Sequence, residues 1–206
     1  APRASRAMTA PIEAPHGVLE TEARALADTH ALSDTPPRPV AALSHLHNVP
    51  DWLVRTRSAL ADSEGAIAKA AEWLLDNEYL VARAVRQIGQ DLPKGFYARL
   101  PTLGGSDVGR PRIWSIARAL LRASRLQLSV PTIARFLDAY QERTPLTIAE
   151  LWALPTFLRL GCLEVLFAAF ERLDRSLRPP FATDDLPDVS LEVTECVGRA
   201  ISNLRT

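Results

Sequence analysis

The stretch TIAELWALPTFLRLGCLEVLFAAF, residues 147–170, decides the fold of this 206-residue chain. It begins with a capping box, in which the Thr147 hydroxyl can accept from the amide of Glu150 while the Glu150 carboxylate reaches back to residue 147. From Leu151 to Phe170 the stretch is apolar on nearly all sides, which is typical of a buried helix. We therefore expect a helix that continues to about Leu177 and forms the central, most buried element.

A membrane crossing is the alternative for so apolar a stretch. Glu150, Arg159 and Glu164 would each cost about 2.5–3.5 kcal/mol near a bilayer centre, whereas each large apolar residue gains only about 0.3–0.6 kcal/mol. The charged residues outweigh the apolar ones in this comparison. We therefore expect burial in protein and no direct membrane span.

Helical periodicity extends over most of the chain after residue 50, and strand signals are almost absent. Further helices are expected at about Ser63–Gln90, Arg112–Ser124, Val130–Glu142 and Ser190–Leu204. The segments between them contain Pro or Gly, which favour turns. The predicted fold class is all-α, a multi-helix bundle domain over residues 51–206.

The first 50 residues differ in composition from the rest, because they hold seven of the 16 prolines together with many alanines. Proline removes a backbone donor and restricts the residue before it, so it interrupts helices. Only one short helix, from about Val18 to Ala31, is expected there. We interpret residues 1–50 as a mostly disordered, flexible, Pro/Ala-rich N-terminal leader.

The charge balance and the cysteine and histidine positions exclude several classes of function. The chain has 24 Lys and Arg residues against 24 Asp and Glu residues, so no net charge attracts it to nucleic acid. Cys162 and Cys196 lie in apolar helical segments, which predicts reduced core thiols. All four histidines precede residue 50, and neither they nor the cysteines show metal-ligand spacing. We expect no metal and no cofactor.

No catalytic or phosphate-binding motif is present either. Gly104 and Gly109 have the spacing of a phosphate-binding loop, but Arg110 and Pro111 follow where Lys and then Ser or Thr are needed. Asp184, Asp185 and Asp188 resemble the paired acids of glycosyltransferases, yet their Pro-rich surroundings favour turn and cap roles. No serine lies in a nucleophile-elbow context. We predict no catalytic residue.

Polar residues interrupt the apolar helical faces. Asn77 and Glu78 fall within the apolar stripe of the 63–90 helix, and Arg159 and Glu164 lie on the central helix. A buried polar group without a partner costs about 1–3 kcal/mol, so each needs one. Candidate partners for Asn77 and Glu78 are Arg112, Arg159 and Arg99. The predicted buried polar network, which would fix the register of the helices, comprises Asn77, Glu78, Arg112, Arg159 and Glu164; the alternative is a ligand or partner site.

Several motifs between Glu72 and Arg172 resemble the N-terminal region of bacterial cyclic β-1,2-glucan synthases. In chain order they are Trp73–Asn77, Asp91–Tyr97 with Leu100-Pro101, Gly109–Arg112, Ala139–Gln141, Thr144–Ile148, Glu150–Ala153, and Leu158-Arg159 with Glu164. Val197-Gly198 fits the same region more weakly.

In that family the helical region precedes a membrane-embedded, processive glycosyltransferase that uses UDP-glucose and a divalent metal. The resemblance implies a non-catalytic N-terminal module, as a fragment or truncated form, on the cytosolic side of the bacterial inner membrane. Its partner would be the membrane-embedded glycosyltransferase portion of the parent enzyme.

Two further functions remain open from the sequence. One is a free-standing all-α protein–protein interaction module with an apolar groove beside Trp114, Trp152 or Phe181. The other is an accessory domain that binds glucan or a sugar nucleotide.

Overall fold

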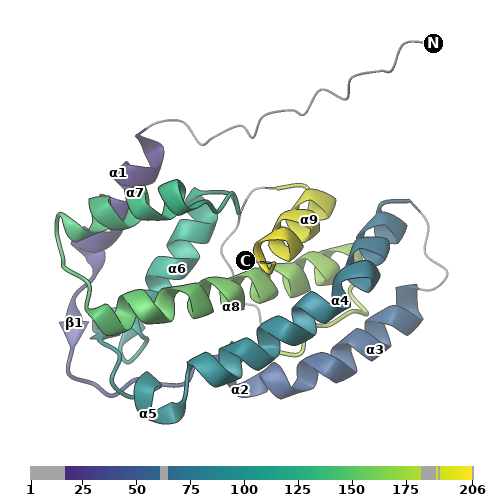
Figure 1. The fold of residues 1–206 in the computed structure, drawn as a ribbon, viewed down its shortest axis with the longest axis horizontal. Helices are drawn as coiled ribbons and strands as arrows, with labels where there is room; N and C mark the ends of the chain where they lie inside the picture. Colours follow the sequence, from purple (N-terminus) through teal and green to yellow (C-terminus); the bar gives the residue numbers. More distant parts are fainter. Residues whose placement is uncertain (1–16, 61–64, 182–188, 190, 206) are drawn as a thin grey trace.

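The computed structural model describes residues 17–60, 65–181, 189 and 191–205. The fold is mostly α-helical, as predicted, with two short strands (Figure 1). In chain order the elements are α1 (Val18–Thr29), β1 (Leu32–Ser33), α2 (Ala41–His45), η1 (Leu46–Asn48), α3 (Val49–Leu60), α4 (Gly65–Asp91), α5 (Lys94–Tyr97), β2 (Thr102–Leu103), η2 (Gly105–Asp107), α6 (Arg112–Ala123), α7 (Val130–Gln141), α8 (Ile148–Leu173) and α9 (Val193–Asn203).

Helix α8 forms the centre of the molecule (Figure 1), which confirms the prediction from its apolar sequence. It contacts α2, α4, α6 and α9. The predicted capping box is present: the Thr147 hydroxyl accepts from the Glu150 amide at 3.3 Å, and the Glu150 carboxylate accepts from the Thr147 amide at 2.9 Å. The helix continues through Pro155, whose ring lies on the exposed side.

The length and composition of α8 also match those of a membrane-spanning helix. Its most apolar 18-residue window has a mean hydropathy of 1.6, and 83% of that window is buried inside the protein. Burial of this extent is what a core helix of a globular domain shows.

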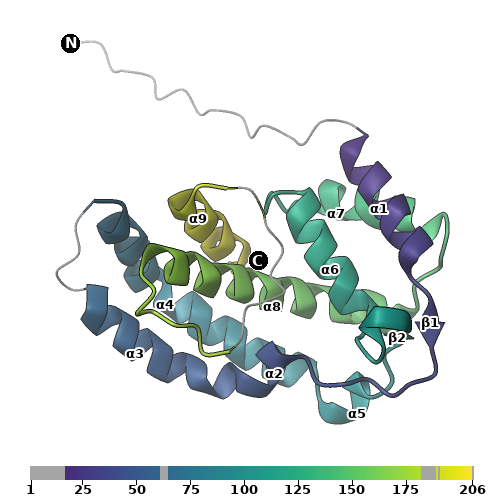
Figure 2. The ribbon, with the colours of Figure 1, turned by 180° about the vertical axis from the view of Figure 1, so that it is seen from behind.

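Two groups of helices surround α8. Helices α1, α6 and α7 pack together near its N-terminal half, and α3, α4 and α9 lie along its C-terminal half (Figure 2). A single apolar core connects the two groups, from Leu19 in α1 to Leu204 after α9.

The interpretation of residues 1–50 as a flexible leader is wrong from residue 17 onward. Residues 1–16 lie outside the described part of the chain, but Leu19, Ala23 and Ala27 of α1 are buried against α6 and α7. Val40 and Ala42 are buried as well. The prolines at 36, 37 and 39 lie between helices and do not interrupt one, and small apolar residues four apart give α1 one buried face.

The link between α1 and α2 is fixed by a small antiparallel sheet. Leu32 pairs with Leu103 and Ser33 pairs with Thr102, so β1 and β2 join segments about 70 residues apart. Pro93, which follows α4, has an extended backbone and stands at the N-cap of α5.

Candidate functional site

Arg112 is the most deeply buried of the five residues of the predicted buried polar network. Its guanidinium donates to both Glu150 carboxylate oxygens, at 2.7 and 2.6 Å, and to the Pro145 carbonyl at 3.0 Å. The Arg112 and Glu150 side chains are 1% and 0% exposed. This ion pair joins the start of α6 to the start of α8, and the second oxygen of Glu150 also completes the cap on Thr147.

Glu164 forms a second buried ion pair, in the middle of α8. It accepts from Arg118 of α6 at 2.8 Å, and the Arg118 guanidinium lies 4.5 Å from the ring centroid of Trp114. A cation over an aromatic face is attracted by the ring quadrupole. The α6–α8 contact therefore contains two ion pairs, one near the N-terminal end of α8 and one near its middle.

The other predicted members lie in separate interactions nearer the surface. Arg159 is 3.6 Å from Asp91 at the end of α4. Glu78 pairs with Arg57 of α3, so the expected partners Arg112, Arg159 and Arg99 are wrong for this residue.

Asn77 is also partnered differently from the expectation. It donates to the Trp73 carbonyl within α4 at 2.8 Å and accepts from Arg205 at 2.9 Å. The five residues therefore do not form one network, although each of them has a polar partner.

A cluster that the sequence did not indicate lies beside Arg112. The His30 ring is held between the Tyr140 hydroxyl, 2.8 Å from Nδ1, and the Ser115 hydroxyl, 3.1 Å from Nε2. Burial and the positive charge of Arg112 lower the pKa of His30 to about 4. Burial also raises the pKa of Tyr140 to about 12. The cluster ties α1, α6 and α7 together and is neutral at pH 7.

A serine beside a histidine can act as a nucleophile with its base, but this pair lacks the other requirements. Ser115 lies in the first turn of α6, and its side chain does not line the cavity between α7 and α9. A histidine whose pKa is near 4 is a weak base at neutral pH. The cluster therefore has the features of a structural hydrogen-bond network.

The described residues contain no group of three or more His, Cys, Asp or Glu side chains that could hold an ion. Asp184, Asp185 and Asp188 lie outside the residues that the structure describes.

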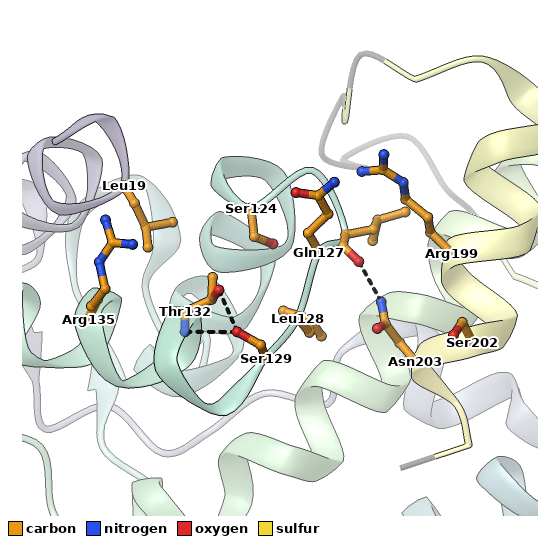
Figure 3. Close-up of a pocket in the computed structure, with 11 residues that line it drawn as sticks. Leu19, Ser124, Gln127, Leu128, Ser129, Thr132, Arg135, Arg199, Ser202 and Asn203 are labelled. Carbon is orange, nitrogen blue, oxygen red and sulfur yellow. Dashed lines mark hydrogen bonds between the residues drawn. The ribbon is translucent and has the colours of Figure 1, made fainter. Parts of the chain in front are cut away.

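A cavity of about 300 Å³ opens between the α6–α7 connection, the start of α7, and α9 (Figure 3). Its volume is at the small end of the roughly 300–1,000 Å³ range of ligand pockets. Eleven residues line it: Leu19, Ser124, Leu126, Gln127, Leu128, Ser129, Thr132, Arg135, Arg199, Ser202 and Asn203.

Apolar side chains are also exposed on the first turns of α8. Ile148 is 71% exposed and Trp152 is 75% exposed, and Leu151 beside them is partly exposed. A contiguous exposed apolar patch of this kind marks an interaction site more often than scattered residues do. Of the three aromatic residues that were expected to border an apolar groove, Trp114 and Phe181 are buried, so only Trp152 can do so.

Comparison with known proteins supports the resemblance that the motifs indicate. No family model matches the chain. Over 134 residues, 64% of its length, the chain is 36% identical to the cyclic beta-(1,2)-glucan synthase NdvB of Rhizobium meliloti (strain 1021). The chain spans only about 5% of the length of that relative. The resemblance expected from the sequence motifs is thereby confirmed: the chain is similar to one region of a cyclic β-1,2-glucan synthase.

Proposed function

We propose that this chain is a non-catalytic helical module of a cyclic β-1,2-glucan synthase, a glycosyltransferase that builds glucan from UDP-glucose. The observation that carries the proposal is the 36% identity to a region of such an enzyme. In this proposal the module lies on the cytosolic side of the bacterial inner membrane, where it packs against the membrane-embedded glycosyltransferase portion of the enzyme.

The roles of the motif residues support the non-catalytic part of this proposal. Arg112, Tyr140, Thr147 and Glu150 all belong to motifs that resemble the family. Arg112 and Glu150 join α6 to α8, Tyr140 joins α7 to the end of α1, and Thr147 caps α8. Their role in holding the helices together explains why these residue types are present, without assigning any of them to catalysis. The same holds for Glu164, which is paired with Arg118.

The exposed apolar patch on α8, defined by Ile148, Leu151 and Trp152, supports the packing part. Its residues lie on the first two turns of a helix that is otherwise mostly buried. Exposed aromatic residues such as Trp152 contribute strongly to protein interfaces when a partner covers them. We assign this patch as the surface that contacts the rest of the synthase.

The experiment compares single variants of the full-length synthase that contains this segment. Ile148→Ser and Trp152→Ala should each lower glucan formation from UDP-glucose in membranes at least fivefold. Val130→Ser is the matched control, because Val130 is also an exposed first residue of a helix, at 81% exposure, but lies on α7. In the isolated chain all three variants should unfold within about 0.5 kcal/mol of the wild type, as surface substitutions do.

Two results would contradict the proposal. One is unchanged glucan formation in the Trp152→Ala enzyme. The other is transfer of glucose from UDP-glucose by the isolated 206-residue chain, which would place catalysis within these residues.

A free-standing interaction module is the second candidate, and the same exposed patch favours it. Light scattering on the isolated chain and on a mixture with the remainder of the synthase separates the two. Complex formation with the remainder supports the synthase module, whereas self-association through Trp152 without it supports the free-standing module.

A further inference from the structure

The cavity between α7 and α9 is framed by a strained turn. Arg125 and Leu126, directly after α6, both have left-handed backbone conformations, with φ of 50° and 61°. Such conformations cost about 1–3 kcal/mol for residues with a side chain and persist only where the surroundings enforce them. Here the turn directs the Leu126 side chain inward, where it is buried.

Helix α9 holds this turn through the backbone carbonyl groups of both residues. Arg199 donates to the Arg125 carbonyl at 2.8 Å. Asn203 donates to the Leu126 carbonyl at 2.9 Å (Figure 3). The wall of the cavity is therefore fixed from both sides, by the turn and by α9. A preformed wall lowers the ordering cost of binding a ligand.

Polar groups with unused hydrogen-bonding capacity face this space. Within the described part of the chain, neither the Gln127 amide nor the Ser202 hydroxyl makes a side-chain hydrogen bond, and both line the cavity. Leu19, Leu126 and Leu128 supply apolar surface beside them. An apolar floor with several hydroxyl and amide groups at the rim matches a sugar ring, which has C–H faces and a hydroxyl edge.

The charges at the cavity favour a neutral ligand over an anionic one. Arg135 is 2.7 Å from Glu20, and the Glu20 pKa is lowered by its hydrogen bond to Arg135. Arg199 is paired with Glu195 and also bonds the turn. A carboxylate thus already neutralises each guanidinium group. A diphosphate would have to displace these carboxylates in order to pair with the arginines.

We infer that this cavity binds a short segment of β-1,2-linked glucan, with Gln127 and Ser202 as hydrogen-bonding residues. The identity of the glucan rests on the proposed function. The expectation of a neutral ligand with many hydroxyl groups rests on the cavity itself. The small volume fits one end or one short stretch of a glucan and not a whole cyclic product. The module would then hold a glucan segment next to the synthase.

The test is a titration of the ¹⁵N-labelled chain with sophorose, the β-1,2-linked disaccharide of glucose, followed by NMR. We expect saturable shifts at the amides of Gln127, Thr132 and Ser202. Gln127→Ala should weaken binding about fivefold, the loss expected for one hydrogen bond of about 1 kcal/mol. Gln90→Ala, at an exposed site on α4, is the matched control and should bind as the wild type does.

Ser202→Leu is the second variant, because the leucine side chain would fill the cavity. Among the described residues Ser202 makes no side-chain hydrogen bond, so the substitution should remove binding while thermal unfolding stays unchanged. UDP and inorganic phosphate should produce no saturable shifts. Saturation by either of these, equally tight binding of maltose, or binding that survives both variants would overturn the inference. If sophorose causes no shifts while the Trp152→Ala synthase still loses activity, the glucan-binding inference fails and the proposed function stands. The activity of the Trp152→Ala enzyme tests the role of the module, whereas the titration tests the cavity.

Discussion

The indole ring of Trp73 packs directly on the backbone of Gly198, where α4 meets α9. A Cβ atom at position 198 would lie 1.5 Å from Cζ3 of Trp73 and 2.3 Å from its Cη2. Both residues belong to sequence motifs that resemble the glucan synthases. The absence of a side chain at Gly198 is thus what allows these two helices to approach each other at this point.

Gly198→Ala should destabilise the chain by about 1–2 kcal/mol. Overpacking costs about 1–3 kcal/mol, and the better helix propensity of Ala returns about 0.5–1 kcal/mol of this. The ring of Trp73 is 40% exposed, so it can turn outward and limit the loss. Urea unfolding of the variant measures the change.

The same substitution should change sign when the ring is absent. In a Trp73→Ala background, Gly198→Ala should stabilise by up to about 1 kcal/mol, because only the propensity gain remains. Gly89→Ala is the matched control in the wild-type chain: a Cβ added at this helical position would meet nothing within 4 Å, so the substitution should be stabilising. If the effects of Gly198→Ala and Trp73→Ala on the unfolding free energy simply add, the Trp73 ring does not limit the approach of α4 and α9.

Arg112→Met should cost about 3–5 kcal/mol of unfolding free energy. It removes one partner of a fully buried pair and leaves the Glu150 carboxylate without its main counter-charge. The double variant Arg112→Met with Glu150→Gln should recover at least ~1 kcal/mol, because a neutral amide costs less to bury and can still accept from the Thr147 amide. Guanidinium chloride titrations of the three proteins give the comparison.

Arg24→Met provides the contrast. Its pair with Glu142 has the same bidentate geometry, at 2.7 and 2.8 Å, but the side chains are 39% and 52% exposed. Exposed pairs contribute about 0.2–1 kcal/mol. Equal losses in Arg24→Met and Arg112→Met would show that burial does not set the strength of the Arg112 pair.

The long helices could be predicted from the sequence because their signals are local. In α8 the capping residues Thr147 and Glu150 are three apart, and the apolar run follows at once. In α4, α6 and α7 the apolar residues likewise recur with a period of 3.6 residues. This spacing can be read within each segment, without knowing which other helices pack against it.

The partners of the polar residues could not be predicted, because they depend on how the helices cross. His30 and Tyr140 are 110 residues apart, and nothing in either segment specifies the other. The polar composition around α1 concealed its buried face, which consists of small residues such as Ala23 and Ala27. The cavity escaped prediction for the same reason, since α7 and α9 contribute to it from separate parts of the chain.

The stability of the chain should fall as the pH drops from about 6.5 to about 4. An unfolded histidine takes up a proton near pH 6.5, whereas folded His30 does so only near 4, so acid in this interval favours the unfolded state. The shift corresponds to at most about 3 kcal/mol, and partial exposure of the ring reduces this to about 2 kcal/mol. Denaturation curves between pH 4 and pH 7 measure the slope.

His30→Gln should flatten this part of the profile, because glutamine keeps a hydrogen-bonding side chain but does not titrate. An NMR titration of the imidazole gives an independent check, with an expected midpoint near 4. A midpoint near 6.5, or the same slope in both proteins, would show that the His30 cluster does not disfavour the charged ring.

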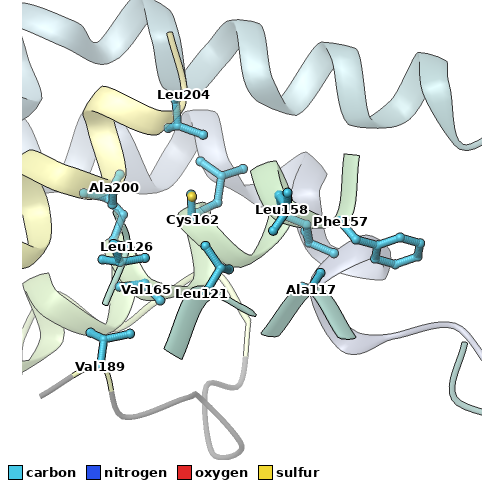
Figure 4. Close-up of a cluster of buried hydrophobic side chains, with 14 of the residues drawn as sticks. Ala117, Leu121, Leu126, Phe157, Leu158, Cys162, Val165, Val189, Ala200 and Leu204 are labelled. Carbon is cyan, nitrogen blue, oxygen red and sulfur yellow. The ribbon is translucent and has the colours of Figure 1, made fainter. Parts of the chain in front are cut away.

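Both cysteines should resist thiol reagents in the folded chain. Cys162 and Cys196 are buried on α8 and α9 and are not joined in a disulfide, and Cys162 lies among apolar side chains that include Val165, Ala200 and Leu204 (Figure 4). Burial raises the pKa of Cys162 to about 12, so at pH 8 only about one thiol in 10,000 is the reactive thiolate. Labelling then requires the α8–α9 contact to open.

The measurement is the rate of reaction with a chromogenic disulfide reagent at pH 8. Ala59→Cys places a thiol on the exposed side of α3 and should react within seconds, while the two native thiols react only as urea opens the fold. Labelling of Cys196 at the rate of the added thiol in native buffer would mean that α9 leaves α8 readily. The clamp that α9 places on the Arg125–Leu126 turn would then be too weak to preform the cavity, so this rate also bears on the binding of glucan.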